Sequence, residues 1–340
     1  MALKNAMARI KDIAQIAGVS EATVSRVLNK TVPVNIETEQ KVRDAIEKAR
    51  YRPNMLAKGL RQQSGKLIGL IVPSIHHPTF SLITSHVEKY TRMSGLNLII
   101  GNTGSDPETE SQIINDMLDR KVNGIITLRV SNKSHATEVL ENYDVPFVLL
   151  DRAQTDSPFS YVMTDNHAAG KMAAGYLYDK GHRDIVCVTG PMDVSVVNMR
   201  LAGFTEELNK KDCQLPPGNI YQCDFTFDSG RQIAEQIIQD HGEITAIWAQ
   251  NDPMALGLMY QYMKLKYTIP RDISIMGMDD IELSSQYIPG LTTIRQPFEE
   301  MCRIAVSYIS EPELRQQKQV LLTPALVERE SVTLIQQDYI

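Results

Sequence analysis

Residues 10–28 carry two short amphipathic segments that are separated by a glycine turn. In residues 10–17 the apolar side chains stand at i, i+3, i+4 and i+7, the spacing of one helix face, and Gly18 ends the pattern. A second apolar set stands at positions 24, 27 and 28. We expect Ser20 to cap the second helix, because its hydroxyl can accept a hydrogen bond from the backbone N–H near Thr23. Two helices joined by such a turn predict a helix-turn-helix.

The second helix of this motif has the composition of a helix that enters the major groove of DNA. Short polar side chains and a single arginine fit the width and depth of that groove. The alternative is a pair of helices from the core of a larger helical protein. A third amphipathic segment at 42–49, which Asn35 could cap, and the residues after it argue against this alternative. The expected DNA-contacting residues are Ser20, Glu21, Ala22, Thr23, Ser25, Arg26 and Asn29.

Two motifs, at 19–29 and 51–60, occur together in this part of the chain. They read VSEATVSRVLN and YRPNMLAKGL, and their combination resembles the DNA-binding head and hinge of the LacI/GalR family of bacterial transcription regulators. The resemblance implies a head at 1–52, a hinge at 53–62 that folds on operator DNA, and a sensor at 63–340. It also implies that the hinge contacts DNA and that its leucine wedges into the minor groove. The hinge residues concerned are Asn54, Ala57, Lys58 and Leu60.

Charge is distributed unevenly along the 340 residues, whose net charge is −6. Residues 1–62 hold twelve Lys and Arg against six Asp and Glu, whereas the remainder holds 23 against 35. A basic head on an acidic body confines the attraction for phosphate to the head. The distribution therefore favours double-stranded DNA as a partner in spite of the negative total.

We expect a cytoplasmic protein without a membrane partner. No stretch reaches the roughly 18 apolar residues of a membrane span, and the N-terminal residues lack the apolar run of a secretory signal. The four cysteines, at 187, 213, 223 and 302, show neither disulfide nor metal-ligand spacing, which fits a reducing compartment.

No motif in the sequence predicts an enzyme, a cofactor or a metal. The glycine fingerprints of nucleotide-binding loops, the zinc-protease motif and the nucleophile elbow are absent. His76 and His77 could suggest a metal site, but neighbouring side chains in a loop point apart and no further ligand set is evident. An α/β oxidoreductase would show the glycine fingerprint, so we expect a binding protein.

From Leu67 onward, short apolar runs alternate with helical patterns in two consecutive series. Strands alternating with helices of 10–15 residues predict parallel sheets built from βαβ units. We therefore expect an α/β sensor of two similar lobes with a cleft between them. The predicted strands are KLIGLIVP, LNLIIGN, GIITL and PFVLLD, then DIVCVTG, 221–224, AIWAQ, DISIMGMDD and TTIRQ. The predicted helices are 80–93, 109–120, 135–142, 168–180, 196–210, 229–240 and 253–264.

Polar residues at or near the predicted strand ends are the candidate ligand contacts, because in open parallel sheets the binding crevice lies there. Any one of them could instead be a helix cap or a surface ion pair. We expect Asp252 in particular to cap a helix, with Pro253 at its first position. As a set, carboxylates, guanidiniums and amides predict a polyhydroxylated ligand, stacked on aromatic rings. The candidates are Asp151, Arg152, Arg200, Asn251, Asp279 and Gln296, with Phe80 and Phe225 as the stacking rings.

The resemblance to the LacI/GalR family extends over nearly the whole chain and implies the type I periplasmic-binding-protein fold for the sensor. Arg200, Asn251 and Asp279 fall on effector-contacting positions of the family, and Phe225 falls on a position that is usually aromatic. The pair at 151–152 is similar to the Asp-Arg pair of sugar-binding relatives. Val194 and Val196 stand where the purine-responsive member has polar ligand contacts, which disfavours a purine and favours a sugar or a sugar derivative. The two arginines leave a phosphate or acid group open.

The chain departs from the family pattern in its head. Arg9 stands where relatives carry a helix-capping threonine, and a cation at this end of a helix is unfavourable by about 0.3–1 kcal/mol. Arg50 replaces a glycine, which puts the left-handed helix end there in doubt. Glu21 and Ala22 occupy the positions that set operator choice. A glutamate at position 21 cannot read guanine as arginine does; it could accept from a cytosine amine or repel DNA.

These observations together predict a sequence-specific transcriptional regulator, a repressor, whose operator affinity is controlled by a small molecule. We expect a sugar as effector and a homodimer bound to a pseudo-palindromic operator, since two heads on a palindrome double the contacts. One alternative is a regulator that responds to a nucleoside or another metabolite. A second is a solute-binding protein without a regulatory role, but this class has a signal peptide and lacks a basic head.

Overall fold

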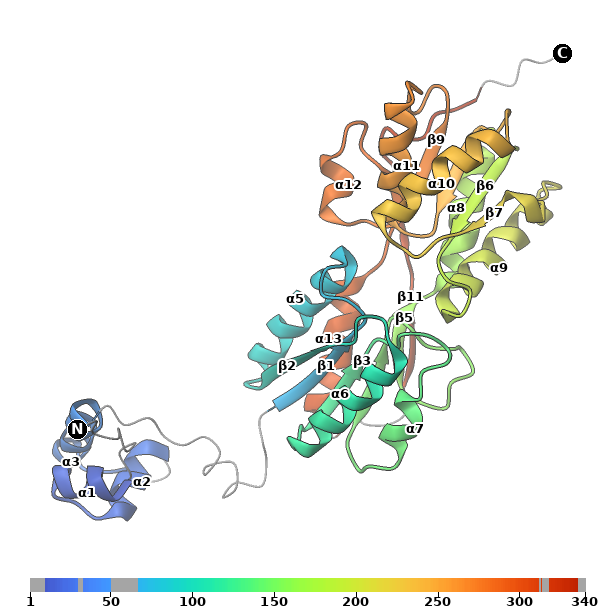
Figure 1. Cartoon of the computed structure of the whole chain (residues 1–340). Helices are drawn as coiled ribbons and strands as arrows, with labels where there is room; N and C mark the ends of the chain where they lie inside the picture. The colour runs from blue at the N-terminus through green and yellow to red at the C-terminus, as the bar shows by residue number, and fades with distance from the viewer. Residues whose placement is uncertain (1–9, 30–32, 50–66, 312, 314–317, 336–340) are drawn as a thin grey trace, which may run out of the picture. The chain divides into compact units, whose positions relative to one another are not determined.

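The structure is a computed structural model that describes residues 10–29, 33–49, 67–311, 313 and 318–335. The chain forms two compact units, residues 1–65 and 66–340. Figure 1 shows a small helical unit at the N-terminus and a larger unit of two α/β lobes. None of the helices in the described ranges is long and apolar enough to cross a membrane.

The N-terminal unit contains the predicted helix-turn-helix and a third helix. The three helices are α1 (Ile10–Ala17), α2 (Glu21–Asn29) and α3 (Ile36–Lys48). Gly18 adopts a positive φ of 66° between the first two, and the backbone N–H of Thr23 donates to Ser20 Oγ at 3.1 Å. Asn35 caps α3 by accepting from the N–H of Glu37 at 2.9 Å. Both predicted caps are therefore confirmed. The small core is formed by Ile13, Ala14, Val24, Val27, Val42 and Ala45.

The first lobe of the larger unit is a parallel sheet with helices on both faces. Its strands follow the order β11-β5-β4-β3-β1-β2. Helices α5 and α13 pack on one face, in a core that includes Leu70 and Phe298, and α6 and α7 pack on the other, in a core that includes Ile125 and Ile114. The strands are β1 (Leu67–Val72), β2 (Asn97–Asn102), β3 (Gly124–Thr127), β4 (Phe147–Leu150), β5 (Tyr161–Thr164) and β11 (Gln319–Leu322). The helices are α5 (Pro78–Met93), α6 (Pro107–Asp119), α7 (Ala136–Glu141) and α13 (Phe298–Ser310).

The second lobe repeats this architecture with the order β12-β10-β9-β8-β6-β7, in which only the β10–β12 pairing is antiparallel. Helices α8 and α9 pack on one face around Trp248, and α10 and α11 pack on the other around Tyr262. The strands are β6 (Ile185–Thr189), β7 (Ile220–Gln222), β8 (Ala246–Ala249), β9 (Ser274–Asp279), β10 (Thr292–Arg295) and β12 (Ala325–Val327). The helices are α8 (Asn166–Asp179), α9 (Ser195–Lys210), the 3-10 turn η1 (Pro217–Asn219), α10 (Phe227–Asp240), α11 (Asp252–Lys264) and α12 (Glu282–Gln286).

The chain crosses between the two lobes three times, in the segments 164–166, 295–298 and 322–325. After completing most of the second lobe it returns to the first as α13 and β11, and then to the second as β12. The sequence patterns did not predict β5, β11, β12, α12 or α13. Strands β11 and β12 are three- or four-residue edge strands with half-exposed side chains, so they lack the continuous apolar run that marked the central strands.

Helices α8 and α9 approach each other through glycines. A Cβ at Gly170 would lie 2.0 Å from the backbone oxygen of Arg200, and one at Gly203 would lie 2.0 Å from that of His167. This close approach places Asn166 Oδ1, at the start of α8, within 2.8 Å of Arg200 Nε on α9. The two glycines therefore position a candidate ligand-binding side chain.

We predict that Gly203→Ala lowers the free energy of unfolding of the sensor by roughly 1–3 kcal/mol, because the added methyl group meets backbone atoms that cannot rotate away. The matched control is Gly175→Ala on α8, where the nearest atom lies 3.9 Å from the added Cβ and stability should be unchanged or higher by up to about 1 kcal/mol. Urea unfolding followed by the fluorescence of Trp248, the single tryptophan, measures both variants. Equal stabilities of the two variants would contradict a tight α8–α9 contact.

Candidate functional site

The eight predicted effector-binding residues meet at one place between the two lobes. They line a small space of about 20 Å³, here called the inner cavity, together with His77, Thr79 and Val196. The eight are Phe80, Asp151, Arg152, Arg200, Phe225, Asn251, Asp279 and Gln296. This volume accommodates about one water molecule. A larger ligand therefore has to move the lobes or the lining side chains.

Strand ends position several of these residues, as the topology of parallel sheets requires, whereas Phe80 lies on α5 and Arg200 on α9. Asp151 and Arg152 follow β4 of the first lobe, whereas Asp279 ends β9 of the second. Asp151, Phe225 and Asp279 have positive φ angles of 66°, 70° and 126°. Such conformations are costly for residues other than glycine and concentrate at functional sites. Three lining residues therefore adopt an unfavourable backbone conformation that directs their side chains into the cavity.

Arg200 is the central cation of the inner cavity. It is 3% exposed, donates from Nε to Asn166 Oδ1 at 2.8 Å and from Nη1 to the backbone oxygen of Gln250 at 2.7 Å. Burial lowers the pKa of its guanidinium, and the charges of Asp279 and Asp151 oppose this effect. Arg200 is thus anchored within its own lobe and faces a carboxylate from each lobe.

Asp279 links the two lobes. Its Oδ2 accepts a hydrogen bond from Thr79 Oγ1 of the first lobe at 2.7 Å, and its Oδ1 accepts from Gln296 Nε2 at 2.6 Å. Burial raises the pKa of this carboxyl to about 7, although the charge of Arg200 lowers it. Burial also raises the pKa of Asp151, whose Oδ1 is buried and has no hydrogen-bond partner among the described residues.

Arg152 lies beside both aromatic rings of the site. Its guanidinium carbon is 5.0 Å from the ring centre of Phe80 and 5.7 Å from that of Phe225, within the range of cation–π attraction. Nη1 donates to the backbone oxygen of Val130 at 3.1 Å, and Nε is buried without a partner among the described residues. The ring of Phe225 packs against Gly190, where a Cβ would lie 2.0 Å from a ring atom.

Asn251 joins the loop that carries Phe225 to the first lobe. Its Nδ2 donates to the backbone oxygen of Phe225 at 2.8 Å, and the His77 ring nitrogen Nε2 lies 3.3 Å from the same oxygen and 3.4 Å from Nδ2. Burial lowers the pKa of His77 to about 4, so its imidazole is neutral at physiological pH. His77 Nδ1 is also buried without a partner in the described part of the chain.

The prediction that Asp252 caps α11 is wrong. Asn251 is the cap, since its Oδ1 accepts from the N–H of Met254 at 3.0 Å, and the helix begins at Asp252. Proline is accepted in the first turn of a helix, so Pro253 did not distinguish the two registers. Asp252 instead stabilises the loop after β9. Its buried carboxylate accepts hydrogen bonds from Ile281 N, Ser284 Oγ and Thr293 Oγ1.

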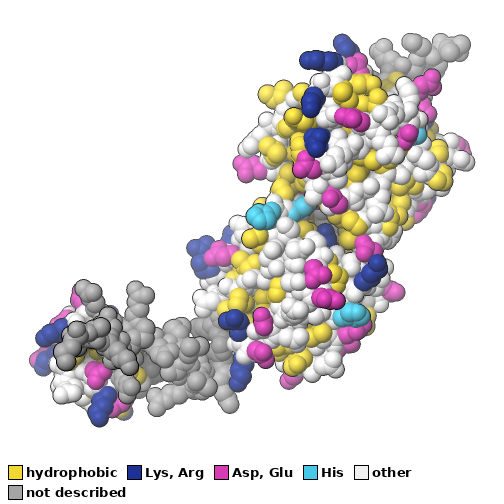
Figure 2. Space-filling model, viewed as in Figure 1, with side chains coloured by type: hydrophobic (Ala, Val, Ile, Leu, Met, Phe, Trp, Pro, Cys, Tyr) yellow, Lys and Arg dark blue, Asp and Glu magenta, His cyan; other side chains and the backbone are white. Residues whose placement is uncertain are grey.

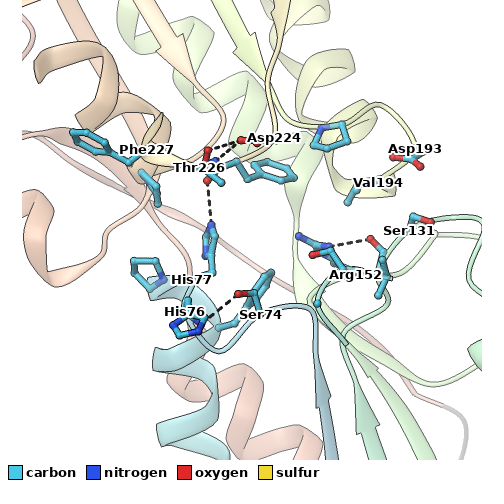
Figure 3. Close-up of a pocket in the computed structure, with 18 of the residues that line it drawn as sticks. Ser74, His76, His77, Ser131, Arg152, Asp193, Val194, Asp224, Thr226 and Phe227 are labelled. Carbon is cyan, nitrogen blue, oxygen red and sulfur yellow. Dashed lines mark hydrogen bonds between the residues drawn. The ribbon is translucent and has the colours of Figure 1, made fainter. Parts of the chain in front are cut away.

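A second and much larger space adjoins the inner cavity. This outer cavity has a volume of about 850 Å³ and shares four lining residues with the inner one, namely His77, Phe80, Arg152 and Phe225. Figure 3 shows side chains from both lobes facing each other across it. Figure 2 shows histidine and hydrophobic side chains side by side at the junction of the lobes.

Further contacts hold the lobes together at the rim. The backbone N–H of Asn132 donates to the oxygen of Asp193 at 2.8 Å, and Lys133 Nζ lies 4.0 Å from the Asp193 carboxylate. Ser195 Oγ donates to the backbone oxygen of Ala153 at 3.0 Å. With the Thr79–Asp279 bond, these contacts form a closed arrangement of the two lobes.

Sequence reasoning missed three residues of the inner cavity. His77 was considered only with His76 as a metal pair, and no group of His, Cys, Asp or Glu suited to a metal occurs among the described residues. Val196 was noted only as an apolar departure from a purine-contacting position. Nothing in the sequence marked Thr79. Each of the three lies several residues after the end of β1 or β6, where the sequence pattern does not determine which way a side chain points.

In the N-terminal unit, helix α2 presents Glu21, Ala22 and Arg26 to solvent. Thr23 and Ser25 are half-buried, and the hydroxyls of Ser20 and Thr23 lie 2.9 Å apart, so capping occupies both. Asn29 ends α2. The predicted hinge residues Asn54, Ala57, Lys58 and Leu60, and the departures Arg9 and Arg50, lie outside the described residues.

Known proteins resemble this chain over nearly its whole length. The family model of bacterial regulatory proteins of the lacI family matches residues 9–54, and that of a periplasmic binding protein domain matches residues 68–306. The ribose operon repressor of Escherichia coli (strain K12) is 33% identical over 96% of this chain and 100% of that protein. The HTH-type transcriptional repressor PurR of Vibrio atlanticus (strain LGP32) is 33% identical over 96% of this chain and 99% of that protein.

Solved structures confirm the predicted fold class. The lac repressor dimer bound to operator and the anti-inducer ONPF has a TM-score of 0.88 at 28% identity and covers 96% of this chain and 100% of that one. The complex of the transcriptional regulator CelR with cellobiose has a TM-score of 0.73 at 25% identity, over 95% and 99% of the two chains.

We predict that the stability difference between Asp279→Asn and the wild type changes with pH. Because the folded-state pKa of Asp279 lies above the value near 4 of an unfolded chain, its contribution to stability is present at low pH and lost as pH rises to about 7. Asparagine does not ionise, so the free energy of unfolding of the variant should rise relative to that of the wild type by on the order of 1–3 kcal/mol between pH 5 and pH 8. Urea unfolding at both pH values measures this, with exposed Asp119→Asn as the control. A constant difference would show that Asp279 is ionised throughout.

Proposed function

Because the chain belongs to the lacI family of bacterial regulatory proteins, we propose that it is a repressor whose operator affinity is set by a sugar bound in the inner cavity. This family consists of transcriptional regulators and not of enzymes. The helix-turn-helix unit supplies the DNA-binding surface, and the two-lobed unit supplies the sensor.

The composition of the inner cavity is the observation that carries the sugar assignment. Two guanidiniums line this cavity together with two carboxyls whose pKa values burial raises, so its walls both donate and accept hydrogen bonds, as a neutral polyhydroxylated ligand requires. Buried polar atoms without a partner among the described residues, Asp151 Oδ1 and Arg152 Nε, suit the hydroxyl groups of a sugar, which both donate and accept. The rings of Phe80 and Phe225 supply apolar faces for the C–H side of a sugar ring.

A purine or nucleoside is the second candidate effector, because one relative is the repressor PurR. The walls that would surround a purine include the apolar Val196 in the inner cavity and Val194 in the outer one. A purine ring needs hydrogen-bonding partners at its edges, and valine offers none. The sugar is therefore favoured, in agreement with the name of the ribose operon repressor among the relatives.

The switch follows from the contacts between the lobes. Thr79 of the first lobe donates a hydrogen bond to the carboxylate of Asp279 of the second. The His77 ring of the first lobe contacts Asn251 and the backbone oxygen of Phe225. A sugar that enters the inner cavity replaces these hydrogen bonds and sets a new separation of the lobes. It changes the affinity for DNA only by as much as it prefers one lobe arrangement over the other.

We propose a homodimer as the DNA-binding form, and exposed apolar side chains on the sensor support it. Ile75, Met93 and Ile100 are 46%, 72% and 46% exposed on the first lobe, near α5 and the edge strand β2. On the second lobe Ile288, which follows α12, is 83% exposed. Figure 1 shows α5 and α12 on the same side of the sensor. Association through this side of the sensor would bury these side chains and cover the edge strand.

We predict that Arg200→Ala and Asp279→Asn abolish the effect of sugars on DNA binding. Operator affinity without sugar should change at most a few-fold, because neither residue lies in the helix-turn-helix unit. The operator is first selected from a random DNA pool, and binding is then titrated by fluorescence anisotropy with D-ribose and other pentoses and hexoses. The control is Arg271→Ala, an exposed arginine of the second lobe, which should respond as wild type. Joint loss of folding and DNA binding in both variants would make the two residues structural.

A further prediction concerns base reading by Arg26. It is the exposed arginine of α2, and arginine paired with guanine is the commonest specific contact in the major groove. Arg26→Ala should weaken binding to the selected operator by about 1–3 kcal/mol and to random DNA much less. Arg43→Ala, an exposed arginine of α3, serves as the control and should keep the ratio of the two affinities. Equal losses of Arg26→Ala on both DNAs would show that this side chain contacts only phosphate.

A further inference from the structure

A chain of hydrogen bonds between buried residues runs from Arg200 to Asp279 through two of the three lobe crossings. Arg200 Nε donates to Asn166 Oδ1 at 2.8 Å, and Asn166 Nδ2 donates to the backbone oxygen of Thr164 at 2.9 Å. Thr164 Oγ1 in turn donates to Gln296 Oε1 at 2.7 Å, and Gln296 Nε2 donates to Asp279 Oδ1 at 2.6 Å. None of the five residues is more than 4% exposed. The chain therefore joins three residues of the inner cavity through two residues that do not line it.

Thr164 is the residue of the first lobe to which this chain of hydrogen bonds is tied. It ends β5 at the crossing 164–166, is fully buried, and lines neither the inner nor the outer cavity. Its hydroxyl is bonded to Gln296, and its backbone oxygen is bonded to the Asn166 amide that holds Arg200. Met301 Sδ lies 3.5 Å from the same hydroxyl, but a thioether is a weak acceptor and does not replace an amide oxygen.

The hydroxyl of Thr79, also from the first lobe, reaches the same group of side chains but differs in its access to a ligand. Thr79 donates to Asp279 Oδ2 and lines the inner cavity, so a sugar that enters competes with it for the carboxyl. Thr164 lies outside the lining, so its bond to Gln296 stays in place when a ligand binds. Without this bond, Gln296 Oε1 would be a buried acceptor that has lost its partner, which is unfavourable.

We propose that Thr164 is a positioning residue of the effector site, whose hydroxyl holds the Gln296 amide, and through it the carboxyl of Asp279, in place for a ligand that carries hydroxyl groups. The inference rests on the proposed function, because it takes the sugar site as given. A sugar binds more tightly when the donors and acceptors that it meets are already oriented, because ordering them on binding costs free energy. Valine has about the volume of threonine but no hydroxyl, so Thr164→Val removes the hydrogen bond and keeps the packing.

The sugar affinity of threonine variants tests the proposal on the full chain. Thermal shift with D-ribose, D-galactose and D-glucose first identifies a sugar that binds the wild type, and calorimetry then gives its Kd for each variant. Thr164→Val should bind this sugar at least fivefold more weakly, whereas Thr164→Ser, which keeps a hydroxyl, should bind within twofold of the wild type. An unchanged or tighter Kd in Thr164→Val, or an equal loss in Thr164→Ser, would overturn the proposal and leave the sugar-responsive function standing.

Thr292→Val is the control for the loss of a buried threonine hydroxyl. Thr292 is fully buried at the start of β10, the end of that strand away from Gln296, and its Oγ1 donates to the backbone oxygen of Arg329 at 3.0 Å. The Tm of this variant without sugar should fall, whereas its Kd for the sugar should stay within twofold of the wild type. An equal loss of sugar affinity in Thr292→Val and Thr164→Val would make the effect one of general stability and contradict the proposal. If no sugar binds the wild type, the proposed function fails and this inference fails with it.

Discussion

The buried guanidinium of Arg200 is the group around which the inner cavity is organised. Removing an arginine from water costs several kcal/mol unless charges and hydrogen bonds compensate. The compensation here comes from four groups: hydrogen-bond acceptors at Asn166 and Gln250 within its own lobe, and the carboxylates of Asp279 and Asp151, one from each lobe. The lobes close around this charge because both contribute to its neutralisation.

This constraint explains features that are otherwise unrelated. Helices α8 and α9 must come close enough for Asn166 to reach Arg200, which glycines at 170 and 203 permit. Asp279 takes a positive φ at the end of β9, and the buried Asp252 supports the loop that follows. Burial raises the pKa of Asp279 although the charge of Arg200 opposes this, so the charge in the cavity is sensitive to pH and to any ligand that enters.

Much of this could be predicted from the sequence. Apolar spacing and capping residues gave the helix-turn-helix, because local hydrogen bonds such as Thr23 N–H to Ser20 determine it. The rule that ligands bind at carboxyl ends of parallel strands, together with the family resemblance and the choice of two stacking rings, selected eight side chains, and the structure brings them together around one cavity. Their role in binding an effector stays a prediction.

The remainder depends on the tertiary structure. Helix α13 and strand β11 belong to the first lobe although they follow the second in sequence, and no local pattern indicates that return. Thr79 and His77 become site residues only because closure of the lobes brings them to Asp279 and Asn251. Asp252 looked like a helix cap because Pro253 fits two registers, and only the loop packed against it shows that its carboxylate has other partners.

Sugar binding and operator binding are coupled through the arrangement of the lobes, and the reciprocity of the two affinities tests this coupling most directly. The Kd of the sugar is measured with and without saturating operator, and the Kd of the operator with and without saturating sugar. If one equilibrium between lobe arrangements links the two sites, both ratios must be equal and differ from one, typically by 5- to 150-fold. A sugar affinity that is the same with and without operator would contradict the coupling.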